Sequence, residues 1–108
     1  MPTITDNETP FACDMTALDG RQKTRVLDLL AKLTAARREI IETPEGYAFR
    51  FEMDDAVFLE AAEFVTLERR CCPFFEFALA VEKEGAAFRL ILNGPEGVKD
   101  FIRIEFGF

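Results

Sequence analysis

Three cysteines and one glutamate are the residues of this 108-residue chain whose types and spacing could do chemistry. Cys71 and Cys72 are adjacent, Glu68 precedes them by about one helical turn, and Cys13 lies far upstream. Thiolates bind Zn²⁺, Cu⁺ and other thiophilic metals, and a carboxylate can supply a further ligand. A thiol beside a carboxyl group can also pair a nucleophile with a general acid or base. The chain has no histidine, which removes imidazole ligands and Cys-His pairs.

Glu68 breaks the pattern of the helix that we predict over residues 56–71. At 3.6 residues per turn, one face of this helix is apolar and carries Val57, Ala61, Phe64, Val65 and Cys72. Glu68 follows Phe64 by four residues and precedes Cys72 by four, so it falls within that face. A buried carboxylate must be paired, protonated or bound to a metal, and such local conflicts are typical of functional sites.

Three interpretations of this cluster stay open. In the first, Glu68 turns to solvent or pairs with Arg50 or Arg89, and the cysteines are small buried side chains. In the second, Cys71, Cys72 and Glu68 bind a soft metal ion such as Zn²⁺, together with Cys13 and with Asp14 as a further candidate. The sequence does not by itself decide whether Cys13 joins the site.

In the third interpretation, one of the adjacent cysteines is a nucleophile and Glu68 its acid or base. Arg69 and Arg70 would stabilise a thiolate there, whereas the C-terminal end of a helix opposes it.

We expect Cys13 to lie near Cys71 and Cys72, because Phe11, Cys13 and Met15 alternate as in an extended segment that needs cover from water. If only Cys13 and one partner meet, a disulfide becomes feasible.

The elements that must position these residues form an α+β pattern. We predict a two-layer sandwich in which helices cover one face of a four-stranded antiparallel sheet, in the order α-β-β-α-β-β-α. Residues 1–10 are expected to be a flexible arm and residues 11–108 a single domain. The expected helices span residues 21–36 and 56–71 and a third that begins at Pro95, and the two hairpins turn at residues 43–46 and 83–86.

Details of packing follow from the same periodicities. The first helix should bury Val26, Leu29, Leu30 and Leu33, with Leu27 widening the stripe. In the second hairpin, a turn at Glu84 and Gly85 places Phe77 opposite Leu92, Leu79 opposite Leu90 and Val81 opposite Phe88. The chain ends in Phe106-Gly-Phe108, and such a tail left in water would be an apolar patch, so we predict a homodimer.

Composition excludes several classes of function. Thirteen Lys and Arg against twenty Asp and Glu give 13 − 20 = −7, and a chain this acidic repels nucleic acid. No apolar run is long enough to span a membrane, and residues 1–9 lack the basic and apolar stretches of a secretory signal. An odd number of cysteines without such a signal favours reduced thiols in the cytoplasm over a disulfide framework.

Two segments, Phe11-Ala-Cys-Asp-Met-Thr-Ala-Leu18 and Glu68-Arg-Arg-Cys-Cys-Pro-Phe-Phe-Glu-Phe77, carry a resemblance, supported by Gly94-Pro-Glu-Gly-Val-Lys99. Through them the chain resembles a group of small uncharacterised bacterial proteins with a Glu-Arg-x-Cys-Cys-Pro-Phe signature. The resemblance covers most of the chain, and Cys13, Glu68, Cys71 and Cys72 match its signature segments. It implies no particular activity.

The leading hypothesis is a small cytoplasmic binding protein whose Cys13, Glu68, Cys71 and Cys72 hold a thiophilic metal, such as zinc, or a small ligand. One alternative is a cysteine-dependent enzyme with Glu68 as acid or base, and another is a homodimeric interaction module without chemistry. Whether the protein is an enzyme at all is left open.

Overall fold

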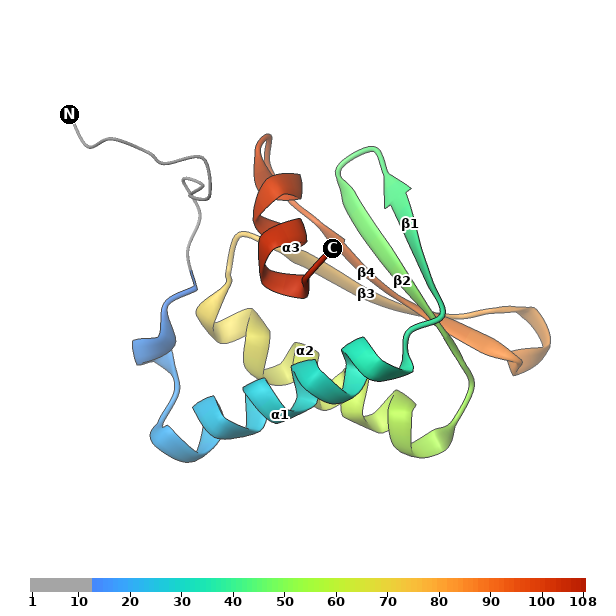
Figure 1. Ribbon diagram of the computed structural model, residues 1–108, viewed down its shortest axis with the longest axis horizontal. Coiled ribbons are helices and arrows are strands. Elements are labelled where there is room, and N and C mark those ends of the chain that lie inside the picture. The colour runs from blue at the N-terminus through green and yellow to red at the C-terminus, as the bar shows by residue number, and fades with distance from the viewer. Residues whose placement is uncertain (1–12) are drawn as a thin grey trace.

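The computed structural model describes residues 13–108, so the predicted arm over residues 1–10 and Phe11 lie outside the described part of the chain. Along the chain come the helices α1 (Gly20–Ala36), α2 (Asp55–Cys71) and α3 (Val98–Phe106), the strands β1 (Glu39–Thr43), β2 (Gly46–Glu52), β3 (Glu76–Val81) and β4 (Ala87–Asn93), and the short 3₁₀ turns η1 (Met15–Ala17) and η2 (Lys83–Gly85). The predicted order α-β-β-α-β-β-α is confirmed (Figure 1).

The four strands form one antiparallel sheet in the order β1-β2-β4-β3. Each hairpin pairs strands that are neighbours in sequence, and the two hairpins join through β2 and β4 at the centre. The predicted register of the second hairpin is confirmed, because Val81 pairs with Phe88 and Phe77 with Leu92. Matching apolar side chains across the strands therefore decided this register, as expected where one face is buried.

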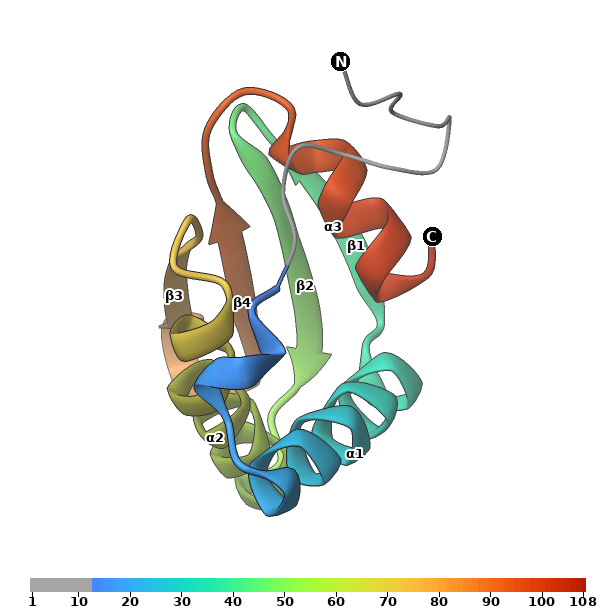
Figure 2. The same ribbon diagram turned by 90° about the vertical axis from the view of Figure 1, so that its left-hand side faces the viewer.

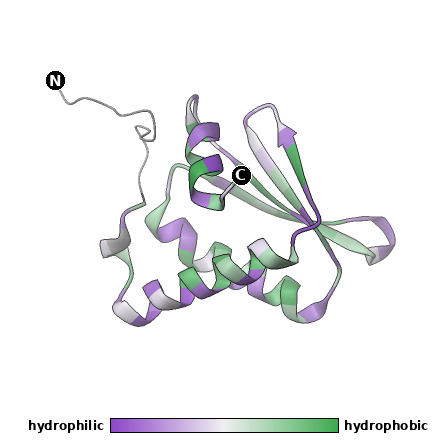
Figure 3. Cartoon of the chain, in the orientation of Figure 1, coloured by the Kyte–Doolittle hydropathy of each residue, from purple (hydrophilic) through white to green (hydrophobic). Residues whose placement is uncertain are grey.

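All three helices cover the same face of the sheet, which makes the fold a two-layer sandwich (Figure 2). The ring of Phe88 in β4 meets Phe58 of α2, and Phe49 in β2 meets Phe106 of α3. Leu29 and Leu33 of α1 are buried in the same core. Along the helices, hydrophilic and hydrophobic bands alternate as this one-sided burial requires (Figure 3).

Side-chain caps begin the two long helices. Asp19 accepts a hydrogen bond from the backbone N–H of Gln22, and the Gln22 side chain accepts one from the backbone N–H of Asp19, which forms a capping box before α1. Asp54 caps α2 through the N–H of Val57 at 3.1 Å. The C-terminal end of α2 carries the candidate residues, and the helix ends at Cys71 because Pro73 keeps Cys72 out of helical geometry.

Three local expectations were wrong. The third helix begins at Val98 rather than Pro95, because Gly97 has a φ of 91° and no helix passes through that conformation. Leu27 is 61% exposed, since it lies a full 100° around α1 from Val26. The segment expected to be extended to Met15 instead enters the 3₁₀ turn η1 at that residue.

The helix-free face of the sheet carries ion pairs. Arg50 pairs with Glu82 at 2.8 Å, and Arg89 approaches the same carboxylate at 3.7 Å. Both arginines are therefore engaged on the face opposite to the helices. Within residues 13–108, no helix has the length and the apolar character that crossing a membrane would require.

The C-terminal tail packs on its own chain. Phe106 is 5% exposed, and the ring of Phe108 meets Tyr47 at a centroid distance of 4.9 Å. α3 carries this tail onto β2 of the same chain. The predicted homodimer thereby loses the support that it drew from the tail, and the oligomeric state stays a prediction.

Replacing Phe106 by alanine should lower the free energy of unfolding by about 3–5 kcal/mol, because the ring fills the contact between Phe49 and Phe64. The control is Ile104→Ala in the same helix, where the side chain is 54% exposed and the loss should stay within about 0.5 kcal/mol. Urea denaturation followed by circular dichroism measures both variants. Equal losses would contradict the assigned packing of α3.

Candidate functional site

The candidate residues meet at the C-terminal end of α2. Glu68 is 1% exposed, and Cys71 and Cys72 are 0% exposed. Glu68 and Cys71 lie on the buried face of the helix with Phe64, and the backbone N–H of Cys72 closes the last turn by donating to the Glu68 carbonyl at 2.8 Å. Glu68 thus lies inside the apolar face, as its spacing predicted, and the interpretation in which it turns to solvent is wrong.

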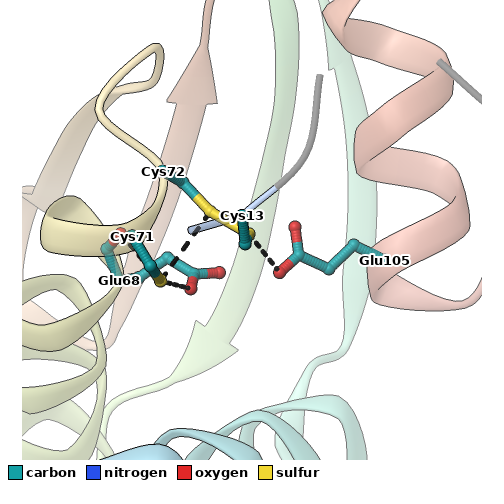
Figure 4. The surroundings of a disulfide bond; sticks show 5 residues. All are labelled: Cys13, Glu68, Cys71, Cys72 and Glu105. Atoms are coloured by element: carbon teal, nitrogen blue, oxygen red, sulfur yellow. Dashed lines mark hydrogen bonds between the residues drawn. A yellow bond between two sulfur atoms is a disulfide. The ribbon is translucent and has the colours of Figure 1, made fainter. Parts of the chain in front are cut away.

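Cys13 reaches this helix end from the other end of the chain. It forms a disulfide with Cys72, with the two Cα atoms 4.9 Å apart (Figure 4). The neighbouring backbone N–H of Asp14 donates to the carbonyl of Cys71 at 2.7 Å. The expected approach of Cys13 to the adjacent cysteines is confirmed, and the preference for three reduced thiols was wrong, because only Cys71 is free.

Cys71 is a protonated thiol held against Glu68. Its Sγ donates to Glu68 Oε1 at 3.1 Å and lies 4.0 Å from Cys72 Sγ. Burial and then the Glu68 carboxylate, with a smaller contribution from Glu105, raise the pKa of Cys71 to about 12. The described surroundings of this thiol thus oppose the formation of a free thiolate.

Glu105 of α3 is a further member of the site. Its Oε1 lies 3.4 Å from Cys13 Sγ. Burial and then the neighbouring Glu68 carboxyl raise the pKa of Glu105 to about 9, so it carries a proton at neutral pH. A disulfide sulfur has no proton to donate, and the hydrogen of the contact with Cys13 therefore belongs to Glu105.

Two buried oxygen atoms lack a partner. Among the described residues, no donor reaches Glu68 Oε2 or Glu105 Oε2. Unpaired buried carboxyl oxygens are costly and require an explanation, such as a shared proton or a cation. Figure 4 shows both carboxyl groups turned towards the space beside the disulfide. The site therefore offers two carboxyl oxygens that could bind a proton or a cation.

Four of these residues have the geometry of a ligand set. One sulfur or carboxylate oxygen from each of Cys13, Glu68, Cys71 and Cys72 lies within 4.8 Å of the corresponding atom of every other member. These are the four residues singled out in the sequence as candidate metal ligands. Their proximity makes a cluster that could hold a metal ion.

Other expectations about the site were wrong. Glu68 pairs with neither Arg50 nor Arg89, because both arginines engage Glu82 on the opposite face of the sheet. Asp14 does not join the cluster: its side chain is exposed and accepts hydrogen bonds from Thr16, which lower the pKa of Asp14.

No positively charged side chain of the described residues contributes to the shifted pKa of Cys71. Arg69 and Arg70 are exposed, and the pKa of Cys71 is set by burial and by carboxylates. Their expected role in stabilising a thiolate has no support in the described structure.

Glu105 was missed in the sequence, although a signal was present. It follows Val98 by seven residues, Phe101 by four and Ile102 by three. Glu68 has the same spacing to Ala61, Phe64 and Val65. The periodicity that placed Glu68 inside an apolar face therefore applies equally to Glu105.

Comparisons with known protein families, curated proteins and solved structures find no match to this chain. The chemistry of the site therefore has to follow from its own residues.

Between about pH 5 and pH 8, the free energy of unfolding of the disulfide-bonded protein should fall as the pH rises. The folded state keeps a proton on Glu105, whose pKa is about 9, whereas the unfolded chain loses it near the ordinary value of about 4.3. The folded state thus binds more protons in this window, and stability is lost by up to about 1.4 kcal/mol per pH unit until the pH passes the folded pKa.

Glu105→Gln should flatten this dependence in urea denaturation across the pH range. The control is Glu42→Gln, because Lys99 lowers the pKa of Glu42 and keeps this surface carboxylate ionised throughout the window. Glu68 and Cys71 face Glu105. The upper limit of pH 8 keeps most of the Cys71 thiol protonated in the unfolded chain as well. An unchanged slope in Glu105→Gln would contradict the assigned proton.

Cys71 should resist alkylation in the folded, unreduced protein. At pH 8 its reaction with iodoacetamide should be about 1,000-fold slower than in urea, because the raised pKa and the burial both withhold the thiolate. Rapid labelling of the folded, unreduced protein would refute this arrangement.

Proposed function

We propose that the reduced protein binds one thiophilic metal ion through Cys13, Cys71, Cys72 and Glu68. The observation that carries this proposal is the gathering of three sulfur atoms and one carboxylate within 4.8 Å of one another. The ligands come from two segments that are remote in sequence, which is how a folded chain builds a closed site.

The distances suit a tetrahedral ion. With Zn–S bonds of ~2.3 Å, two sulfurs of one tetrahedral site lie about 3.8 Å apart. Cys71 Sγ and Cys72 Sγ already lie 4.0 Å apart, with the disulfide still closed. Opening the disulfide lets the sulfur atoms of Cys13 and Cys72 separate towards the same spacing.

Electrostatics support a cation as the occupant. The unpartnered oxygen of Glu68 is fully buried, and Glu105 carries a second one. Among the described residues, the basic side chains nearest in sequence, Arg69 and Arg70, are exposed. A soft cation would compensate the buried negative charge, and thiolate ligands favour Zn²⁺, Cd²⁺, Cu⁺ or Hg²⁺ over Mg²⁺ or Ca²⁺.

The cysteine-dependent enzyme is the less favoured function. Glu68 does lie within reach of Cys71 as an acid or base. The same contact and the burial of the thiol raise the pKa of Cys71 to about 12, whereas a nucleophilic cysteine needs its pKa lowered. A metal ion would reverse this balance, because a coordinating thiol loses its proton outright.

Titration of the reduced protein with Cd²⁺ or Zn²⁺ should give one ion per chain with a dissociation constant below about 1 μM, measured by competition with a coloured chelator. Glu68→Gln should weaken binding by about tenfold or more, because it removes the only anionic oxygen of the ligand set. The control is Glu76→Gln, an exposed glutamate eight residues further along, which should bind as the wild type does.

Cys72→Ser should weaken binding more than Glu68→Gln, because serine is a poor ligand for a soft ion. Circular dichroism of each variant establishes that the fold is kept. Reduced wild-type protein that takes up no Cd²⁺, Zn²⁺ or Cu⁺ at tens of micromolar would overturn the proposed function.

A further inference from the structure

Two of the sulfur atoms in the proposed metal site are joined to each other. Cys13 and Cys72 form the disulfide, and Cys71 and Glu68 are what remains of the ligand set. We propose that the Cys13–Cys72 disulfide is a redox gate on this site: the oxidised protein excludes the metal ion, and reduction by a small thiol opens the site to it. This inference rests on the proposed function and adds its regulation.

The oxidised site is a poor metal ligand set. Its two remaining ligands, Cys71 and Glu68, are three residues apart on α2. The thiol of Cys71 donates a hydrogen bond to the Glu68 carboxylate at 3.1 Å. The thiol keeps its proton in this hydrogen bond, and a metal ligand must be a thiolate. A structural zinc site uses four ligands. In the oxidised protein the sulfurs of Cys13 and Cys72 carry no negative charge, so only two of the four ligands are left.

Access decides how the gate opens. Cys71 and Cys72 have no exposed surface, whereas Cys13 is only partly buried. A small thiolate therefore attacks Cys13 Sγ, forming a mixed disulfide there and breaking the bond to Cys72, whose sulfur leaves as a thiolate. A second thiolate then attacks the small-molecule sulfur of the mixed disulfide and releases Cys13 as a thiolate.

The sum balances: one protein disulfide gains two electrons and two protons, and two small thiols become one small disulfide. The ion then binds the sulfurs of Cys13, Cys71 and Cys72 in place of their three protons, which pass to the solvent, and the reverse step returns a proton to Cys71. Closing is the reverse reaction, in which a small-molecule disulfide takes the electrons and the ion is released as the protein disulfide forms.

The fold keeps the ligands together while the disulfide is open. The backbone N–H of Asp14 donates to the Cys71 carbonyl at 2.7 Å, next to Cys13 and independently of its sulfur. Leu18, a few residues further along, is 4% exposed and belongs to the core. The segment that carries Cys13 thus has two attachments besides the disulfide, so the reduced sulfur stays beside α2.

The test compares the two redox forms of the full chain with Cd²⁺ as the probe. The reduced form should bind one ion, with the ultraviolet absorption of cadmium–thiolate bonds, and the oxidised form should bind about 100-fold more weakly or not at all. Adding an excess of a small disulfide to the loaded protein should release the ion while peptide mapping shows the Cys13–Cys72 bond forming. Release without that bond would overturn the gate.

Cys13→Ser is the matched variant, since it keeps Cys71, Cys72 and Glu68 but cannot form this disulfide. Its affinity for Cd²⁺ should be weaker than that of the reduced wild type and unchanged by the small disulfide. Equal release from Cys13→Ser would assign the gate to Cys71 and Cys72 and refute the proposal. If the variant binds too weakly to compare, the wild-type titration with peptide mapping decides.

The two proposals fail in different ways. Oxidised and reduced wild-type proteins that bind Cd²⁺ equally well would refute the gate and leave the metal site standing. A reduced protein that binds none of the ions tested would refute both.

Discussion

A carboxylate loses its hydration when it is buried, and it must then find a proton, a donor or a cation. Glu68 is buried at the end of α2 under this constraint. The surrounding groups respond to it: Cys71 keeps its proton and donates to Glu68, and Glu105 keeps its own proton because burial and Glu68 raise the pKa of Glu105. The proposed cation would displace the proton of Cys71, whereas a nucleophilic cysteine needs a lowered pKa, and the pKa of Cys71 is raised.

Three remote segments have to meet for this balance to exist. α2 brings Glu68, Cys71 and Cys72, the segment before η1 brings Cys13, and α3 brings Glu105 (Figure 4). The aromatic core fixes two of them, because Phe64 of α2 and Phe106 of α3 contact each other and hold both helices against the sheet. The third is tied by the disulfide and by the hydrogen bond from Asp14 to Cys71. The same core contacts that stabilise the fold therefore also position the residues of the site.

The disulfide and the proposed metal ion solve the same structural task. Either one would link the segment of Cys13 to the end of α2, and both use the sulfurs of Cys13 and Cys72. They cannot do so together, because a disulfide sulfur carries no charge and a metal ligand must be a thiolate. In this interpretation the oxidised and the metal-bound protein are alternative closed forms around the same buried carboxyl groups.

The sequence by itself determined the order of helices and strands, the register of the second hairpin and the position of Glu68 within an apolar face, because these follow from local periods of 3.6 and 2 residues. The same 3.6-residue period places Glu105 in the apolar face of α3. Which sulfur pairs with Cys13 was decided only by tertiary structure, since adjacent cysteines project in different directions from the end of a helix. Tertiary structure alone also turned Arg50 and Arg89 away from Glu68 and carried Phe106 and Phe108 back onto β2. The physical reason is that contacts between remote segments depend on how the helices pack on the sheet. No local pattern in the sequence encodes the distance between residues on different elements.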